Sequence, residues 1–209
     1  MPRTQQTTDI EVFQAQFKNI VEREVKREGV ERLMAWLDKS DFYEAPASSK
    51  YHGAWRGGLC AHSLDTYDEM WRLAQTYEGE LAVFCEQKKL LMEESVAICA
   101  LFHDLCKVNF YKPETRNRKN DAGEWEAYTA YGIDEKFKFG GHGSKSVFLI
   151  QNFITLRPEE AVAVNCHMGI GDGQDHVSEA YEANPLALLL HFADEAACFL
   201  QPIDRSGEP

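Results

Sequence analysis

The sequence predicts an all-α fold, a helical bundle interrupted by one small β-hairpin around residues 110–139. Apolar residues recur at helical spacing through most of the chain. Residues 108–139 are instead rich in strand formers, around the turn signal at 121–123. The 209 residues suffice for one sizeable core. We therefore expect a single domain, 1–209, in which residues 1–50 pack on a core formed by residues 51–200.

The composition disfavours nucleic-acid-coating, membrane-spanning and secreted proteins. Asp and Glu number 34 against 22 Lys and Arg, which gives a formal net charge of −12 and disfavours a protein that coats nucleic acid. No stretch reaches the roughly 18 apolar residues that cross a bilayer, so no membrane association is expected. The N-terminus lacks the apolar core of a signal peptide. Six scattered cysteines without a CxxC motif predict reduced, buried thiols and a cytoplasmic location.

The first part of the chain predicts two helices and a loop. Residues 8–27 carry apolar side chains at helical spacing, and residues 30–37 repeat the pattern over a shorter span. Turn formers and a proline fill residues 38–50. The paired glycines Gly57 and Gly58 then allow a tight entry into the next helix.

The rest of the chain predicts the helices of the core. Pro158 suits the first turn of a helix, since proline at that position loses no hydrogen bond. On either side of the hairpin, helical runs are expected at about 59–77, 93–106, 140–153, 158–167 and 185–200.

Six polar side chains lie in or at the ends of these apolar helices. Metal binding is one explanation for polar residues at such positions. A lone histidine or aspartate on a helix is more often a hydrogen-bonded core or surface residue. A buried imidazole beside a carboxylate is nevertheless costly unless something satisfies both, and helical bundles build metal sites from inward side chains of facing helices. Because the six occur together, we predict that they bind metal: His62, His103, Asp104, His142, His167 and Asp194.

The order of these residues resembles that of the HD-domain superfamily of metal-dependent phosphohydrolases. The strings that carry the resemblance are GGLCAHS at 57–63, LFHDLCK at 101–107, GHGSKS at 141–146 and HMG at 167–169. They are similar to small stand-alone bacterial or phage-type HD hydrolases, and to the HD part of a family of 3′-to-5′ exoribonucleases. This chain has no room for the separate nucleic-acid-binding domain of those nucleases, so long nucleic acid is not expected as a substrate.

The resemblance implies which ligands hold metal. The founding HD positions match His62, His103, Asp104 and Asp194, and members with two metals add histidines at the positions of His142 and His167. We assign the first four to one ion and Asp104, His142 and His167 to a second, with Asp104 as the bridge. Imidazole and carboxylate donors without thiolate favour two divalent transition-metal ions, such as Fe, Mn, Co, Ni or Zn.

The chemistry expected of such a site is hydrolysis of a phosphoester by a metal-activated water. Asp104 and Lys107 are the predicted catalytic residues, with Lys107 about one turn farther along. Lys107 can stabilise charge on a phosphate, or simply complement the helix dipole. Lys145, Arg56 and His52 are predicted to bind the substrate, although charged loop residues are often only solvated. The expected substrate is a small phosphorylated molecule, namely a nucleotide, a cyclic nucleotide or a short oligonucleotide.

Two alternatives share the same ligands. Inositol oxygenase and a phosphonate-cleaving oxygenase use a similar six-residue HD arrangement, so a mixed-valent di-iron oxygenase remains open. A nucleotide-binding module without turnover is the other alternative. The compact, acidic chain and the position of Lys107 favour hydrolysis of a small substrate.

Overall fold

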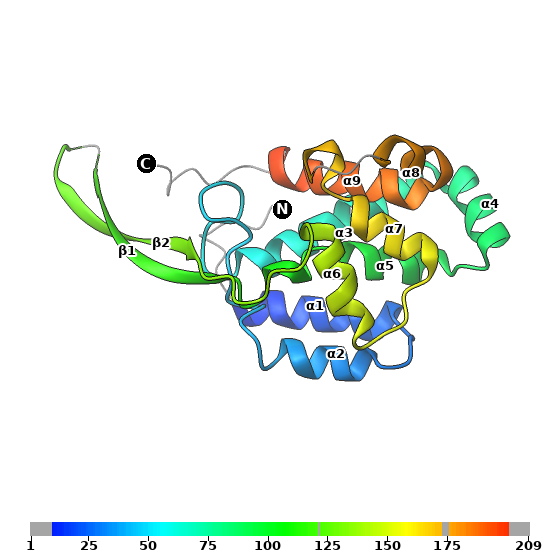
Figure 1. Ribbon diagram of the computed structural model, residues 1–209, viewed down its shortest axis with the longest axis horizontal. Helices are drawn as coiled ribbons and strands as arrows, with labels where there is room; N and C mark the ends of the chain where they lie inside the picture. The colour runs from blue at the N-terminus through cyan, green and yellow to red at the C-terminus, as the bar shows by residue number, and fades with distance from the viewer. Residues whose placement is uncertain (1–9, 121, 173–175, 201–209) are drawn as a thin grey trace.

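The computed structural model of the chain describes residues 10–120, 122–172 and 176–200. It shows a helical body from which a two-stranded antiparallel hairpin projects at one end (Figure 1), so the predicted mainly helical fold with a hairpin is confirmed. The first elements are α1 (Ile10–Glu24), α2 (Val30–Leu37), α3 (Gly58–Thr76), α4 (Glu78–Lys88), α5 (Met92–Phe102) and the 3-10 helix η2 (Leu105–Lys107). They are followed by β1 (Tyr111–Lys119), β2 (Trp125–Ile133), α6 (His142–Gln151), α7 (Pro158–Cys166), the 3-10 helix η3 (Gly169–Asp172), α8 (Val177–Ala183) and α9 (Pro185–Phe199).

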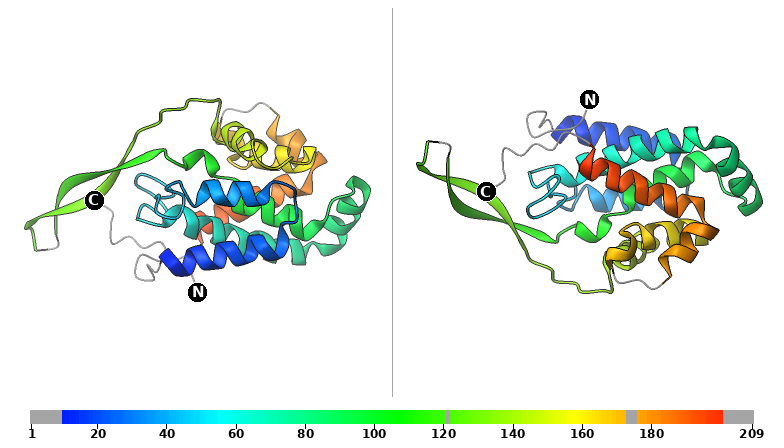
Figure 2. Two further views of the ribbon diagram at one scale, coloured as in Figure 1. Left: turned by 90° about the horizontal axis from the view of Figure 1, so that it is seen from below. Right: turned by 90° about the horizontal axis from the view of Figure 1, so that it is seen from above.

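The core is built around α5, which packs against α1, α3, α7 and α9. Its residues from Glu94 to Phe102 are all buried, as expected of a helix that is apolar on every side. The two views of Figure 2 show α5 enclosed by the other helices of the body. The residues that immediately follow α5 therefore emerge inside the molecule rather than at its surface.

Helix α1 covers one side of this core and fixes the loop that leads to α3. The ring of Phe17 makes edge-on contacts with Phe42 and Phe102, at centroid distances of 4.9 and 5.9 Å. Leu59 N, in the first turn of α3, donates a hydrogen bond to Ala45 O at 2.9 Å. The loop between α2 and α3 is thus held against the same core that buries α5.

A buried ion network joins the end of α1 to α5 and α7. The Arg27 guanidinium donates to both carboxylate oxygens of Glu160, at 2.9 and 3.0 Å, and to Glu94 at 3.0 Å. Glu160 has no exposed surface, and it also accepts a hydrogen bond from Ser95 Oγ at 2.8 Å. Its charge is therefore balanced and hydrogen-bonded, which a buried carboxylate requires.

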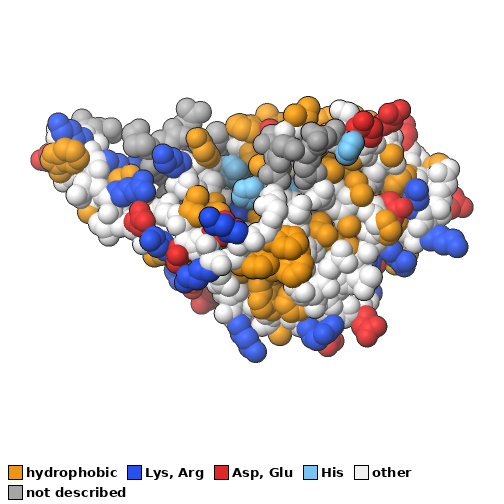
Figure 3. Space-filling model, in the orientation of Figure 1, with side chains coloured by type: hydrophobic (Ala, Val, Ile, Leu, Met, Phe, Trp, Pro, Cys, Tyr) orange, Lys and Arg blue, Asp and Glu red, His pale blue; other side chains and the backbone are white. Residues whose placement is uncertain are grey.

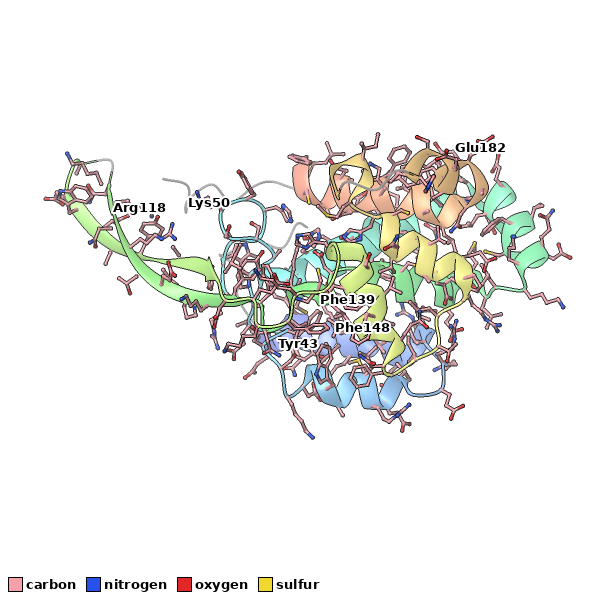
Figure 4. The ribbon with its side chains drawn as sticks, in the orientation of Figure 1. Tyr43, Lys50, Arg118, Phe139, Phe148 and Glu182 are labelled. Atoms are coloured by element: carbon pink, nitrogen blue, oxygen red, sulfur yellow. The ribbon has the colours of Figure 1, made fainter. Side chains whose placement is uncertain are left out.

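The hairpin runs in register from Tyr111 opposite Ile133 to Lys119 opposite Trp125. Its cations lie against its own aromatic rings and carboxylates. Arg118, labelled in Figure 4, lies 5.1 Å from the Tyr128 ring and donates to a carboxylate on β2 at 2.7 Å. Lys119 lies 5.6 Å from the ring of Trp125.

One helix end and two short helices differ from the sequence-based expectations. The helix expected to reach residue 106 ends at Phe102, and the tighter turn η2 follows. Helices α4 and α8 were not predicted, because the apolar residues of α4 form one run at 81–85 and α8 spans only seven residues, so neither shows a clear helical repeat. In the described part of the chain, no helix has the length and apolarity that a membrane span requires.

Candidate metal centre

Four elements deliver buried His and Asp side chains to one place inside the body. His62 lies on α3, the pair His103-Asp104 follows the end of α5, His167 follows the end of α7, and Asp194 lies on α9. Helices α3, α5 and α9 pack on one another, and α7 packs on both α5 and α9 (Figure 1). His103 and His167 have no exposed surface, and the other three side chains are buried as well. These five residues are called the metal centre below.

Three of these residues form a compact inner group. His62 Nε2 lies 3.0 Å from Asp194 Oδ1 and 3.2 Å from His103 Nε2. His103 Nε2 lies 3.7 Å from the same Asp194 oxygen. The three ligand atoms are close enough to hold one metal ion.

Asp104 links this inner group to His167. Its Oδ2 lies 3.5 Å from His103 Nε2 and 3.6 Å from His62 Nε2. Its other oxygen, Oδ1, lies 3.7 Å from His167 Nε2. His103, Asp104 and His167 form a second group of three that could hold a metal ion. The two oxygens of Asp104 thus face different histidines, which is the arrangement that a bridging carboxylate needs.

Backbone contacts orient two of the imidazole rings. The Nδ1 atoms of His103 and His167 lie 2.9 and 2.6 Å from the carbonyl oxygens of Ala100 and Val164. A carbonyl only accepts hydrogen bonds, so we assign the ring proton to Nδ1, which leaves a lone pair on each Nε2. Within the described chain, His167 Nε2 is buried without a hydrogen-bond partner. A buried acceptor in this state suits a bound cation, and such backbone contacts commonly orient metal-ligating histidines.

The charges of the centre also suit a cation. Burial raises the pKa of Asp104, but Lys107 and His103 outweigh it and hold that pKa well below its usual range. Burial raises the pKa of Asp194 too, but the neighbouring His103 and His62 outweigh it and hold that pKa well below its usual range. Lys107 Nζ donates to Asp104 Oδ2 at 2.5 Å. Two buried carboxylates thus face one ammonium group, and a divalent cation would supply further positive charge.

Three predicted site residues have other contacts in the structure. His142 begins α6, where its Nδ1 lies 3.4 Å from Cys106 Sγ, and it belongs to none of the metal-compatible groups of the described residues. Lys145 Nζ binds Glu135 Oε1 at 2.7 Å. Arg56 pairs with a glutamate of the loop before α3 at 2.8 Å, at the surface. Their roles as ligand and substrate contacts stay predictions.

Two further side chains lie against the centre. The His52 ring lies 4.8 Å from the His62 ring, centroid to centroid, and His52, His62 and Cys198 form a third metal-compatible group, called the edge group below. Sequence reasoning placed His52 on the substrate and did not consider Cys198 as a ligand. Sequence spacing could have pointed to Cys198, because it lies four residues after Asp194 and hence on the same face of α9. Figure 3 shows histidine side chains reaching the surface between the hairpin and the body.

Comparison of the chain with protein-family models, curated proteins and solved structures gave no match. The assignment of the metal centre therefore depends on the geometry of its own residues. Those residues fit a metal ion through inward-facing imidazole nitrogens, two ionised carboxylates and one buried acceptor without a partner.

Proposed function

We propose that this protein is a metal-dependent phosphohydrolase of the HD type. It cleaves a phosphoester of a nucleotide, a cyclic nucleotide or a short oligonucleotide. The observation that carries the proposal is the environment of Asp104, whose two oxygens face His103 and His167 while Lys107 binds one of them. This arrangement places cation ligands and a permanent positive charge around one carboxylate, as phosphoryl transfer requires.

The ligands divide between two adjacent positions. The inner group His62, His103 and Asp194 would hold one ion, and Asp104 with His167 would supply ligands for a second. A bound Fe, Mn, Co, Ni or Zn ion would act as a Lewis acid on a phosphoryl oxygen and lower the pKa of a coordinated water. Asp104 orients both positions because its side chain is buried and fixed by Lys107.

Lys107 has a separate task in this proposal. Its side chain is buried, and the Asp104 carboxylate raises its pKa against the opposing effect of burial, which keeps the ammonium charged. A phosphoryl group that approaches Asp104 meets this ammonium, which stabilises the negative charge of the transition state.

The surface charges support a small substrate. The chain carries a net charge of −12, which repels a long polyanion. On the hairpin, Arg118 pairs with Glu126 and Arg116 pairs with Glu114, so these cations are already balanced by their own carboxylates.

The test combines metal content with a substrate screen. The full chain, purified without chelator, is assayed with Mn²⁺, Co²⁺ or Fe²⁺ against nucleoside mono-, di- and triphosphates, cyclic dinucleotides and short oligonucleotides. Asp194→Asn should abolish cleavage, because it removes an inner ligand charge. The matched control is Glu182→Gln, an exposed carboxylate on α8 that Figure 4 labels at the far end of the body, and it should behave as wild type.

Two results would contradict hydrolysis. A metal-loaded protein that binds a nucleotide but cleaves none of the panel is a binding module. Oxygen uptake on addition of substrate, with an electron paramagnetic resonance signal from a mixed-valent iron pair, identifies an oxygenase.

A further inference from the structure

The edge group stands beside the metal centre and differs from it in chemistry. It joins the imidazoles of His52 and His62 to the thiol of Cys198, with all ligand atoms within 4.8 Å of one another. The inner group and the Asp104 group contain only nitrogen and oxygen donors. Thiolate is a softer ligand than imidazole or carboxylate and selects for thiophilic metals.

Asp194 is a fourth candidate donor beside the edge group. Asp194 Oδ1 lies 3.7 Å from Cys198 Sγ and 3.0 Å from His62 Nε2. Around a tetrahedral Zn²⁺ with bonds of 2.0–2.3 Å, neighbouring ligand atoms are separated by roughly 3.3–3.8 Å. The two separations at Asp194 are near this range, but Asp194 lies outside the group of atoms within 4.8 Å of one another and must approach His52 to complete a four-coordinate site.

His52 supports a ligand at the edge group. Its Nε2 is buried without a hydrogen-bond partner among the described residues. A buried polar atom of this kind is uncommon and indicates a missing partner. The ring of His52 lies against that of His62, and one of its ring nitrogens lies within 4.8 Å of the Cys198 thiol.

The backbone around His52 is firmly held. The carbonyl oxygens of His52 and Gly53 accept hydrogen bonds from Ser48 Oγ and Ala47 N, both at 2.9 Å. A Cβ atom on Gly58 would lie 1.9 Å from Gly53 O, so the loop packs directly on the start of α3. The backbone of His52 is therefore held in place by contacts with the rest of the loop and with the start of α3.

We propose that His52, His62, Asp194 and Cys198 form a binding position for a thiophilic divalent cation such as Zn²⁺ or Co²⁺. Binding breaks the Sγ–H bond of Cys198, forms a metal–sulfur bond and releases the proton to solvent. The position adjoins the inner group because both contain His62 and Asp194. It depends on metal binding alone and not on phosphoester hydrolysis.

Co²⁺ is the probe, because a thiolate ligand gives it a near-ultraviolet charge-transfer band that imidazole and carboxylate ligands do not. Chelator-treated full-length protein is titrated with Co²⁺ alone. The wild type should show the band and Cys198→Ser should lose it. Loss of even a hydrogen-bonding partner of a metal ligand weakens binding about 10- to 100-fold, so His52→Gln should weaken this Co²⁺ site by at least about tenfold.

Matched variants identify the source of the band. Cys106→Ser removes the other thiol close to the centre, 3.7 Å from Asp104 Oδ1, and Cys85→Ser removes a buried thiol on α4. Both should keep the band. His103→Gln disrupts the inner group but leaves the edge group complete, and it should keep the band too. Absence of the band in wild type, or its survival in Cys198→Ser, overturns the proposal.

Circular dichroism and thermal unfolding check that each variant is folded. Should Cys198→Ser fail to fold, ¹¹³Cd nuclear magnetic resonance of the wild type and His52→Gln decides the question. A chemical shift typical of sulfur ligation that changes in His52→Gln supports the edge position. A shift typical of nitrogen and oxygen ligands alone overturns it. A wild-type protein that shows the Co²⁺ charge-transfer band but hydrolyses no substrate of the screen would contradict only the proposed activity.

Discussion

The Nε2 atoms of His62 and His103 lie 3.2 Å apart, although the two residues are 41 positions apart in the sequence. The carbonyl contact of His103 Nδ1 directs the unprotonated side of that ring toward His62. Two ring nitrogens at this distance share a proton or a cation, since two facing lone pairs repel each other. The nearby carboxylates of Asp194 and Asp104 favour the positive charge.

Replacing His103 should affect metal content more than replacing His142. His103 belongs to both the inner group and the Asp104 group, whereas His142 belongs to neither. We expect His103→Gln to lose most of the metal that copurifies with the wild type and His142→Gln to retain at least one ion per chain. Elemental analysis of chelator-free preparations measures this. Equal loss in both variants would show that His142 is an essential ligand.

Removing Arg27 should strongly destabilise the fold. Arg27→Met leaves Glu160 and Glu94 buried without their cation, and breaking a buried pair in this way costs about 3–5 kcal/mol. Urea denaturation monitored by circular dichroism gives the free energy of unfolding. The control is Arg72→Met, because the exposed pair of Arg72 with Glu69 should contribute at most about 1 kcal/mol. Similar losses in the two variants would contradict a structural role for the buried network.

Two glycines in helices should respond oppositely to alanine. A Cβ atom on Gly143 would lie 2.1 Å from Asn165 O, so Gly143→Ala forces α6 away from α7 and should cost on the order of 1–3 kcal/mol. Gly79, on α4, has nothing within 4 Å of the same position, and Gly79→Ala should stabilise by up to about 1 kcal/mol. Thermal unfolding of both variants measures the difference. Equal midpoints would mean that α6 and α7 tolerate wider spacing.

Acid should destabilise the chelator-treated protein partly through His52. Burial, followed by the nearby His62, lowers the pKa of His52 to about 3. Histidine in an unfolded chain titrates near pH ~6.5, so the unfolded state binds more protons between these two values. The stability that neutral His52 contributes is therefore complete above the unfolded pKa and is lost as the pH falls toward the folded one.

The variant His52→Gln isolates this contribution. Its free energy of unfolding should fall less than that of the wild type between about pH 7 and pH 4. The reason is that the variant lacks the imidazole that takes up a proton near pH ~6.5 in the unfolded chain. Urea titrations at several pH values in chelator measure the slope. His176→Gln changes an exposed histidine and should keep the wild-type slope. A wild-type slope in His52→Gln would show that protonation of His52 does not limit acid stability.

The sequence alone determined the helical class, the hairpin and the residue types of the candidate site. Periodic apolar residues predict helices because each helix must bury one face, and the buried run before His103 and Asp104 marked them as residues of the interior. The single-domain assignment and the HD resemblance stay predictions. Helix α4 was missed because its apolar residues form one run at 81–85 instead of a helical repeat, and only packing on the body shows that Leu81, Phe84 and Cys85 are the buried ones.

Only the tertiary structure decided which polar side chains meet. Spacing along the chain fixes the face of a helix that a residue occupies, but the packing and rotation of neighbouring helices fix which faces come together. The fold accordingly brings His62, His103 and Asp194 within ligand distance, adds His52 and Cys198 at their edge, and places Lys145 against Glu135 instead. The sequence predicted a metal site, and the packing of α3, α5, α7 and α9 decided which of the predicted ligands meet.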